Sequence, residues 1–301
     1  MVRQRPAKPL SPVRIWVPPF LIHFLARSSP LLYLVSSPIG NLADLSQRAI
    51  DCLLSSDYIL CEDTRHSCIL FQKYSINKPL RSYHKFNEAS REDQIISDLL
   101  NNKIISLVCD AGTPGIADPG SRLVERCVKE HIPIHAIPGP CAAITALTCS
   151  GLNTERFQFI GFLPKKPQEC KSLLYELLSY PGTTICYESS KRILKTLAYL
   201  QKLAPQRKLV LAKELTKKFE EFFRGHAEEI VENLQNSAPK GELVLMISGN
   251  LSQSTEWESL SFKEHVQMLE QEYSISKKEA VKIVAQLRGI PKRVVYNNTL
   301  S

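Results

Sequence analysis

From Leu31 onward, short apolar runs alternate with amphipathic stretches, and this alternation is the feature that most constrains the fold. The amphipathic stretches are typical of helices, and the apolar runs between them are typical of buried strands. Parallel strands need a crossover between them, so the succession predicts βαβ units in a mostly parallel sheet. The predicted strands of this first half are residues 31–36, 57–61, 103–109 and 132–137, and its predicted helices are residues 42–56, 65–75, 88–102 and 120–131.

A second succession of strands and helices follows "SGLNTER" at residues 150–156, which we interpret as a linker. Because 301 residues exceed the usual size of one domain, we expect an α/β domain over 31–150 and another over 151–250. The second domain has predicted strands at 157–162, 183–188, 208–213 and 241–247, with helices at 168–179, 190–203 and 226–235.

Beyond residue 250 the composition shifts, and residues 251–301 are predicted to form a small basic helical appendage. Ser276 and Glu279 have the spacing of a capping box that opens a helix over 277–288, and Gly289 is the expected stop. A second short helix is predicted over 291–300, which makes the appendage helix-turn-helix-like.

The formal net charge of +8 is concentrated at the two ends of the chain. The first thirty residues hold five Lys or Arg and no acid, while residues 271–301 hold six against two. A basic end is typical of a polyanion-binding surface, although a solvated helix face is the simpler explanation of the charge by itself.

Residues 1–30 contain an apolar stretch that Pro18 and Pro19 interrupt, so it is too short and broken for a membrane span. No clean small-residue cleavage site follows it, which argues against a secretory signal. We expect an accessory tail or a mis-assigned translation start, and intact-mass measurement of the native protein tests the latter. Nine cysteines without a C-x-x-C pair or zinc spacing predict reduced thiols in a cytosolic protein and no metal site.

Four segments rich in turn residues follow predicted strands: "PIGN" (38–41), "EDTR" (62–65), "DAGTPGIADPG" (110–120) and "PGPCAAITAL" (138–147). Ligands bind at the carboxyl ends of parallel strands, so four such loops predict a site there. Gly lets the backbone approach a ligand and Pro fixes the loop, which suits a small zwitterionic or nucleoside-bearing cofactor. Neither a P-loop nor a G-x-G-x-x-G fingerprint is present, and the G-x-S-x-G elbow is also missing.

These segments and others after them resemble the successive motifs of one family. "LYLVSSPIGNLADLSQRAI", "ILCEDTRHS", "YHKFNE", "VCDAGTPGIADPGSRLV", "IPGPCAAITALTCSGL", "RFQFIGFLPKK", "YESSKR", "LAKELTKKFEEFFRG" and "KGELVLMISG" look like the ribosomal small-subunit methyltransferase I family. That family has a tetrapyrrole methylase-like class III fold, which implies two α/β domains with a cofactor cleft between them. The resemblance runs collinearly from Leu31 to Gly249 and more weakly into the appendage.

The resemblance implies 2'-O-methylation of a cytidine in the decoding centre of 16S rRNA of the small ribosomal subunit. It also implies S-adenosyl-L-methionine as the methyl donor, a homodimer as the assembly, and a cytoplasmic enzyme. By family position, the residues expected to line the cofactor pocket are Pro38, Asp110, Gly112, Thr113, Pro114, Ala117, Asp118, Thr145, Ala146, Tyr187, Ala212 and Lys213. Asp110 and Asp118 have a second interpretation as caps of a following helix, and Lys213 has one as an ion-pair partner of Glu214.

Removal of a proton from a ribose hydroxyl needs a base or a polar group that stabilises the developing charge. The predicted catalytic group is a set of charged residues at strand ends: Glu62, Asp63, Arg65, His84 and Glu88. Arg65 is expected to orient substrate phosphate or base, and His84 or Glu88 to lie near the ribose. An ordinary loop histidine is an equally good interpretation of His84.

RNA contacts need cations and stacking surfaces. The predicted RNA-binding cations are Lys165, Lys166, Lys191, Arg192, Lys217, Lys218, Lys292 and Arg293, with Lys277 and Lys278 adding to the charge of the appendage. Tyr83, Phe86, Phe162 and Phe219 are candidates for stacking on a base, although we expect most of them to be buried in a core.

Two other functions remain open at this point. One keeps the fold and makes the protein a methyltransferase acting on a tetrapyrrole carbon, against which stand the basic appendage and the "PIGNL" and "EDTRHS" loops. The other is a non-catalytic RNA-binding module for ribosome assembly, against which stand the intact "DAGTP" and "PGP" loops.

Overall fold

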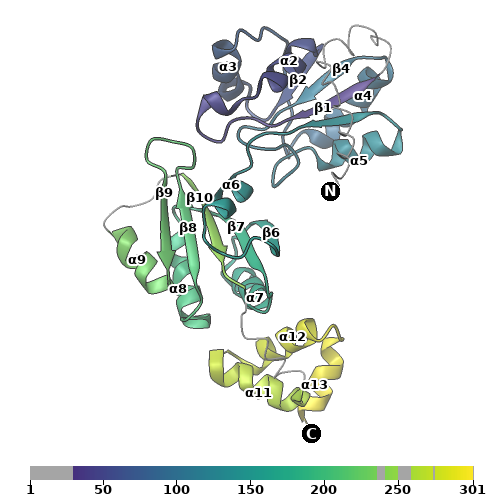
Figure 1. The fold of residues 1–301 in the computed structure, drawn as a ribbon. Helices are drawn as coiled ribbons and strands as arrows, with labels where there is room; N and C mark the ends of the chain where they lie inside the picture. Colours follow the sequence, from purple (N-terminus) through teal and green to yellow (C-terminus); the bar gives the residue numbers. More distant parts are fainter. Residues whose placement is uncertain (1–29, 236–240, 250–258, 274, 301) are drawn as a thin grey trace, which may run out of the picture. The chain divides into compact units, whose positions relative to one another are not determined.

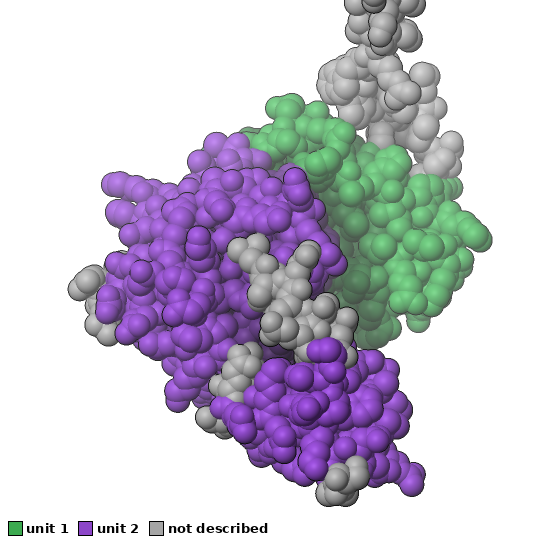
Figure 2. All heavy atoms as spheres, turned by 60° about the horizontal axis from the view of Figure 1, so that its bottom comes forward, with its two compact units in different colours: residues 1–35, 45–110, 119–138 green, residues 36–44, 111–118, 139–301 purple. Residues whose placement is uncertain are grey.

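A computed structural model describes residues 30–235, 241–249, 259–273 and 275–300, and the chain divides into two compact units (Figure 1). Of the described residues, unit 1 contains residues 30–35 together with Leu45–Asp110 and Pro119–Pro138. Unit 2 contains Ser36–Asp44, Ala111–Asp118 and the chain from Gly139 on, as the two colours of Figure 2 show. The expectations about residues 1–29 lie outside the described residues.

Unit 1 is built on a parallel sheet in the order β3-β2-β4-β1-β5, in which every pair of neighbours is parallel. The prediction of a parallel βαβ sheet is therefore confirmed. Its strands are β1 (Leu31–Val35), β2 (Tyr58–Cys61), β3 (Leu80–Ser82), β4 (Ile104–Leu107) and β5 (Ile134–Ile137), and its helices are α2 (Gln47–Ser55), α3 (Thr64–Lys73), α4 (Glu88–Leu100) and α5 (Ser121–Lys129).

The buried core of unit 1 joins strands β1, β2 and β4 to helices α4 and α5. Leu32, Leu60 and Leu107 come from neighbouring strands, and Leu99 and Leu123 come from the two helices. These apolar side chains recur with the period of their own element, which is why the sequence pattern located the elements correctly.

A buried carboxylate, Asp98 on α4, ties the amino-terminal side of this sheet together. It accepts hydrogen bonds from Tyr58 Oη at 3.0 Å, Arg81 Nη1 at 3.0 Å and Lys103 Nζ at 2.7 Å. Burial acts to raise the pKa of Asp98, but the hydrogen bonds from Lys103, Tyr58 and Arg81 outweigh it, so the pKa is lowered. The ionised form is therefore part of the fold.

Unit 2 is built on a mixed sheet in the order β6-β7-β10-β8-β9. Strands β6 and β7 are parallel, whereas β10 runs antiparallel to β7 and β8, and β9 runs antiparallel to β8. The strands are β6 (Phe157–Phe162), β7 (Thr183–Ser189), β8 (Leu209–Lys213), β9 (Glu221–Gly225) and β10 (Glu242–Ile247), and the helices next to them are α6 (Ala142–Thr148), α7 (Pro167–Leu178), α8 (Ile193–Leu203) and α9 (Ala227–Gln235).

The second sheet is covered on both faces. One core contains side chains of α7, α8 and α9, such as Leu174, Leu197 and Ile230. The other contains Ala143 and Ala146 of α6 against the opposite face of β7, β8 and β10, with Ile39 and Leu152 packed beside them. Short side chains on α6 let the preceding loop lie close to the sheet.

A buried ion pair fixes the segment after β6. Glu188, with 1% of its surface exposed, accepts hydrogen bonds from Ser189 N at 2.8 Å, Thr196 Oγ1 at 2.8 Å and Arg192 Nη2 at 3.1 Å. Arg192 Nη2 also donates to the carbonyl oxygens of Leu163 and Pro164 at 3.1 and 2.8 Å. The pair thus joins β7 and α8 to the turn that precedes α7.

Three helices end the chain: α11 (Phe262–Tyr273), α12 (Lys277–Leu287) and α13 (Lys292–Leu300). The capping box is confirmed, since Ser276 N donates to Glu279 Oε2 at 3.1 Å and Glu279 N donates to Ser276 Oγ at 3.4 Å. Gly289, at φ +63°, ends α12 as predicted. The sequence predicted only the last two of these helices, so α11 was missed. Side chains of all three helices share a core with α7.

In the described part of the chain, none of the helices is long and apolar enough to cross a membrane. All nine cysteines are free thiols.

Candidate functional site

Three of the four turn-rich loops are joined to one another inside unit 2. Ser37 and Gly112 form an isolated antiparallel bridge, with N···O distances of 2.8 and 3.1 Å. Thr113 Oγ1 lies 3.1 Å from Ser36 Oγ and donates to the Pro140 carbonyl oxygen at 3.1 Å. The loops that follow β1, β4 and β5 therefore form one junction, in which Thr113 contacts both of the others.

Glycine is required where these loops meet. A Cβ on Gly139 would lie 2.8 Å from the Ser36 Cβ, and Gly112 has φ +90°. Loop 111–118 also contains Gly115 at φ +81° and Ala117 at φ +64°. These left-handed residues let the backbone of the loop turn where a regular strand or helix could not continue.

The loop after β1 also contacts the turn between β8 and β9. Asn41 N donates to Thr216 Oγ1 at 3.0 Å, and a Cβ on Gly40 would lie 2.7 Å from the Leu215 carbonyl oxygen. Glu214 and Thr216 adopt positive φ values of 51° and 63°, which are strained for residues with side chains. This strained turn therefore sits directly against the "PIGN" loop.

Tyr187 lies on the face of β7 that α6 covers. Its ring makes edge contacts with Phe159 and Phe162, at centroid distances of 4.9 and 5.4 Å. Burial raises the pKa of Tyr187, with a smaller contribution from Cys141, while a hydrogen bond with the Ala143 backbone lowers it. The phenol is thus neutral at physiological pH and faces the start of α6.

The cofactor-lining residues predicted for unit 2 have different surroundings. Pro38, Gly112, Pro114, Ala146 and Ala212 are buried, and Thr113, Ala117, Asp118 and Thr145 are partly exposed. Lys213 is buried at the end of β8, and its Nζ lies 2.7 Å from Glu221 Oε2 rather than near Glu214, which pairs with Lys217 at 3.0 Å. Asp118 does not cap α5, because that helix begins at Ser121 with Gly120 in the capping position.

In unit 1, the ends of β2 and β4 are joined by carboxylates. Asp110 Oδ1 accepts a hydrogen bond from Asp63 N at 3.2 Å, so Asp110 holds the neighbouring loop instead of capping a helix. Asp63 is the N-cap of α3 and accepts hydrogen bonds from Arg65 N, Nε and Nη2 at 2.9, 3.2 and 2.8 Å. Arg65 lowers the pKa of Asp63 to about 2, and a carboxylate this weakly basic is poorly suited to take a proton from a hydroxyl.

His84 and Glu88 lie in the loop after β3 and at the start of α4. His84 Nδ1 accepts a hydrogen bond from Phe86 N at 3.3 Å, and His84 N donates to Asn87 Oδ1 at 2.8 Å. A neutral ring that accepts at Nδ1 carries its proton on Nε2, so His84 is a hydrogen-bond donor in this arrangement. This favours the interpretation of His84 as a loop residue.

His66 is a candidate that the sequence reasoning missed. It lies in the first turn of α3, and its Nδ1 is 3.9 Å from Asp110 Oδ1. An imidazole oriented by a carboxylate is the usual arrangement of a general base. The only signal in the sequence was the position of His66 directly after "EDTR", because the N-cap role of Asp63, which sets where α3 begins, is shown by the structure.

The predicted RNA-binding cations differ in exposure. Lys165, Lys191, Lys218, Lys292 and Arg293 are exposed. Lys166 and Lys217 are exposed as well, but they form ion pairs with Glu169 and Glu214. Arg192 is half-buried and its guanidinium is bound to Glu188 and two carbonyl oxygens, so its geometry is that of a structural residue.

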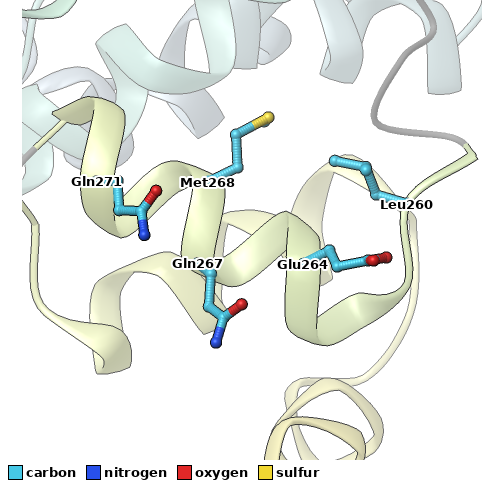
Figure 3. A pocket seen from close by; sticks show the side chains of 5 residues that line it. All are labelled: Leu260, Glu264, Gln267, Met268 and Gln271. Carbon is cyan, nitrogen blue, oxygen red and sulfur yellow. The ribbon is translucent and has the colours of Figure 1, made fainter.

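A hollow on the surface of α11 does not coincide with any of these groups. Leu260, Glu264, Gln267, Met268 and Gln271 line it, and Figure 3 shows their side chains spread along α11 and the segment before it. None of the predicted site residues is among them. Within the described ranges, no cluster of His, Cys, Asp and Glu has the arrangement of a metal site.

The loop residues of unit 2 fit S-adenosylmethionine in their chemistry. The main chain of loop 111–118, with its glycines, can hydrogen-bond to an adenine. The Asp118 carboxylate can accept hydrogen bonds from a ribose diol or an ammonium group, and Thr145 has a hydroxyl that can donate or accept one. The path of these loops depends on Gly139, where a Cβ would clash with Ser36, and on Gly112, whose φ of +90° is strained for other residues.

Comparison with known proteins identifies a family. The profile of the family described as Tetrapyrrole (Corrin/Porphyrin) Methylases matches residues 31–231. Among solved structures, diphthine synthase has a TM-score of 0.58 at 13% identity over 76% of this chain and 93% of its own. A cobalt precorrin-4 methyltransferase has a TM-score of 0.55 at 13% identity over 72% and 94%. Both are similar in fold.

Curated relatives are much more similar in sequence. Proteins named "Ribosomal RNA small subunit methyltransferase I" are 43% identical in Halalkalibacterium halodurans, 40% in Bacillus subtilis and 38% in Escherichia coli O157:H7. The alignments cover 88–89% of this chain and 93–94% of the relatives. The chain therefore belongs to the tetrapyrrole methylase family and, within it, to the ribosomal RNA small subunit methyltransferase I group, so it is a methyltransferase.

Proposed function

We propose that this protein transfers a methyl group from S-adenosyl-L-methionine to the 2'-hydroxyl of a cytidine in the decoding centre of 16S rRNA. The observation that carries the proposal is the likeness to relatives named as small-subunit rRNA methyltransferases over nearly nine tenths of the chain. The loop junction around Thr113 supports it, because it supplies a preorganised cradle of main chain.

The residues of unit 2 hold the donor in this proposal. S-adenosylmethionine supplies an electrophilic methyl group on a sulfonium. Loop 111–118 and Pro38 orient it, Asp118 and Thr145 bind its polar groups, and Tyr187, Ala212 and Lys213 flank it. Because transfer needs the oxygen, carbon and sulfur in line, the fixed geometry of the junction matters more than any single contact.

The proton of the ribose hydroxyl goes to His66 in our proposal, with Asp110 orienting the imidazole. The 3.9 Å separation of His66 Nδ1 and Asp110 Oδ1 leaves room for the pair to tighten when substrate binds. Asp63 and Arg65 position the loop and bind substrate, while Glu62, His84 and Glu88 complete the polar surface next to it.

The RNA is held through its phosphates by exposed cations. Lys165 and Lys166 precede α7, Lys191 precedes α8, Lys217 and Lys218 lie on the β8–β9 turn, and Lys292 and Arg293 begin α13. Neutralising several phosphates makes affinity fall steeply with salt. We place the reaction in the cytoplasm, where nine free thiols stay reduced, and expect the enzyme to act as a homodimer.

Methyl transfer from labelled S-adenosylmethionine tests the proposal. The acceptors are small ribosomal subunits, free 16S rRNA and a tetrapyrrole precursor, and the modified nucleoside is identified by mass. A 2'-O-methylcytidine from the subunit is the expected product. Label in the tetrapyrrole alone would assign the protein to the other branch of its family, and donor binding without any transfer would indicate a non-catalytic RNA-binding protein.

A further inference from the structure

Phe86 is the most exposed large apolar side chain of the described residues, with 96% of its surface accessible. It lies between β3 and α4 of unit 1, in the loop that also holds His84. A phenyl ring fully in water contributes almost nothing to the fold and costs solvation free energy. Of the four aromatic residues considered for stacking, Tyr83 is completely buried, and Phe162 and Phe219 are exposed by 43% and 70%.

The loop that carries Phe86 is held by several hydrogen bonds. Asn87 is its centre, because its side chain accepts a hydrogen bond from His84 N at 2.8 Å and donates to Ser82 O and Oγ at 3.2 and 3.1 Å. Phe86 N donates to His84 Nδ1, and the two rings are in edge contact at 6.0 Å. The exposed ring is thus displayed on an ordered support, which lowers the entropy lost when a partner binds.

Two cationic side chains lie on loops at the same edge of the sheet as Phe86. Tyr83 N donates to Cys61 O at 2.8 Å, which places the loop after β3 beside the loop after β2. Lys85 adjoins Phe86, and Arg65 lies on the neighbouring loop with its side chain exposed by 89%. An exposed ring among cations is the chemistry of a single-stranded nucleic acid site, in which bases stack and phosphates pair.

We propose that Phe86 is a stacking platform for an unpaired base next to the target nucleotide, with Lys85 and Arg65 beside the flanking phosphates. The inference deepens the proposed function and rests on it. Strand β2 lies between β3 and β4 in the sheet, and neighbouring strands are about 4.8 Å apart. The end of β3, which leads to Phe86, is therefore roughly 10 Å from the end of β4, which leads to Asp110. That separation suits a neighbour of the reacting nucleotide.

The test uses the full-length enzyme with small ribosomal subunits as the probe, in four variants. Phe86→Ala removes the ring, Phe86→Leu keeps an apolar side chain without a π face, and Phe86→Trp keeps an aromatic face. Leu100→Ala is the matched control, because Leu100 is a 54% exposed apolar residue at the other end of α4. For each variant, kcat and KM for subunits, the Kd for S-adenosylmethionine, the melting temperature and the mass in solution are measured.

We expect Phe86→Ala to raise the KM for subunits between about 5- and 150-fold, the range measured when a stacking aromatic is removed. Phe86→Leu should follow Phe86→Ala, whereas Phe86→Trp and Leu100→Ala should resemble the wild type. Donor affinity and melting temperature should not change, because the ring is 96% exposed and lies outside the buried core.

Three results would overturn the inference: a wild-type KM for Phe86→Ala, full activity of Phe86→Leu, or a change in solution mass that makes Phe86 a contact between copies. These results are distinct from failure of the proposed function itself. If the wild-type enzyme transferred no methyl group to subunits, the RNA substrate would be wrong before any variant was compared.

Discussion

Asn41 donates a backbone hydrogen bond to Thr216 Oγ1 at 3.0 Å and so joins two residues 175 positions apart in the sequence. Asn41 belongs to the loop after β1, which the Ser37–Gly112 bridge ties to loop 111–118. Thr216 belongs to the strained turn between β8 and β9, next to Lys217 and Lys218. The loops proposed to hold the donor and a turn predicted to contact RNA are therefore parts of one connected structure in unit 2.

Gly40→Ala tests this connection. A Cβ at position 40 would lie 2.7 Å from the Leu215 carbonyl oxygen, so the loop or the turn must move. We expect a loss of about 1–3 kcal/mol in the free energy of unfolding and weaker binding of S-adenosylmethionine. Urea denaturation and calorimetry measure the two quantities. Ala43→Ser, which adds an atom at an exposed position of the same loop, should change neither, and a Gly40→Ala protein that behaves like it would refute the contact.

His66→Gln should lower kcat by about 100-fold or more while leaving donor affinity intact, because a positioned base contributes that much to proton transfer. His84→Gln is the comparison, because the Nδ1 atom of His84 already accepts a hydrogen bond from Phe86 N. The kcat of this variant should stay within a few-fold of the wild-type value. Steady-state kinetics with small subunits measures both. Equal losses in the two variants would remove His66 from the role of base.

Arg192→Met should destabilise unit 2 by about 3 kcal/mol, because Glu188 would remain buried without its cation. Glu188→Gln in the Arg192→Met background should recover part of this loss, since a neutral amide costs less to bury. A double-mutant cycle in urea measures the coupling, expected to exceed about 1 kcal/mol. Additive effects would mean that the two side chains stabilise the turn independently.

The lowered pKa of Asp98 makes the stability of unit 1 depend on pH at the acid end. The folded state loses this proton more readily than the unfolded chain, so the ionised carboxylate stabilises the fold above the ordinary Asp pKa near 3.9. The stabilisation disappears as the pH falls through the lowered value. Asp98→Asn should be less stable at pH 7 and should lose less stability on acidification, as measured by urea midpoints from pH 7 to 3. Asp93→Asn, an exposed change on the same helix, should follow the wild type.

His265 predicts a second pH effect, in the C-terminal helices. Burial, and next the charge of Arg288, lower the pKa of His265 to about 4, and Arg288 Nε donates to His265 Nδ1 at 3.2 Å. The neutral ring therefore stabilises these helices fully above pH 6.5, and up to about 3 kcal/mol is lost as the pH falls from 6.5 to 4.

Hydrogen exchange of α11–α13 at pH 7 and pH 5, corrected for intrinsic rates, should show weaker protection at the lower pH. His265→Gln keeps an acceptor but does not titrate, so its protection should not depend on pH in this range. The exposed His135→Gln serves as the control and should retain the wild-type dependence.

Periodicity was sufficient to predict most elements, because buried strands and amphipathic helices differ in their local pattern. Strands β3 and β9 and helices α6 and α11 were not among the predicted elements, and β9 and α6 were missed for local reasons. "EFFRG" has only one buried side chain and follows β8 after a charged turn, and the short α6 is hidden among Gly, Pro and Ala. The antiparallel position of β10 between β7 and β8 depends on pairing between distant segments, which a local pattern does not report.

The candidate site was predictable as a set of loops but not in its pairings. Gly and Pro marked loops of which three meet in the structure, since their backbone preferences are local. Sequence did not reveal that Lys213 pairs with Glu221, that Asp63 caps α3, or that His66 lies beside Asp110. The exposure of Phe86, Phe162 and Phe219 was also missed, because aromatic residues are expected in cores unless the fold leaves no partner for them.

The interleaving of the two units has a consequence for synthesis on the ribosome. Residues 36–44 emerge early, but the turn after β8 that receives Asn41 is made some 175 residues later. The loop at residues 36–44 can therefore form its native contacts only after most of the chain has been synthesised. Contacts between residues this far apart in the sequence slow folding. A fragment that stops near residue 150 would carry this loop without its acceptor, so we expect the two units to be poor candidates for separate expression.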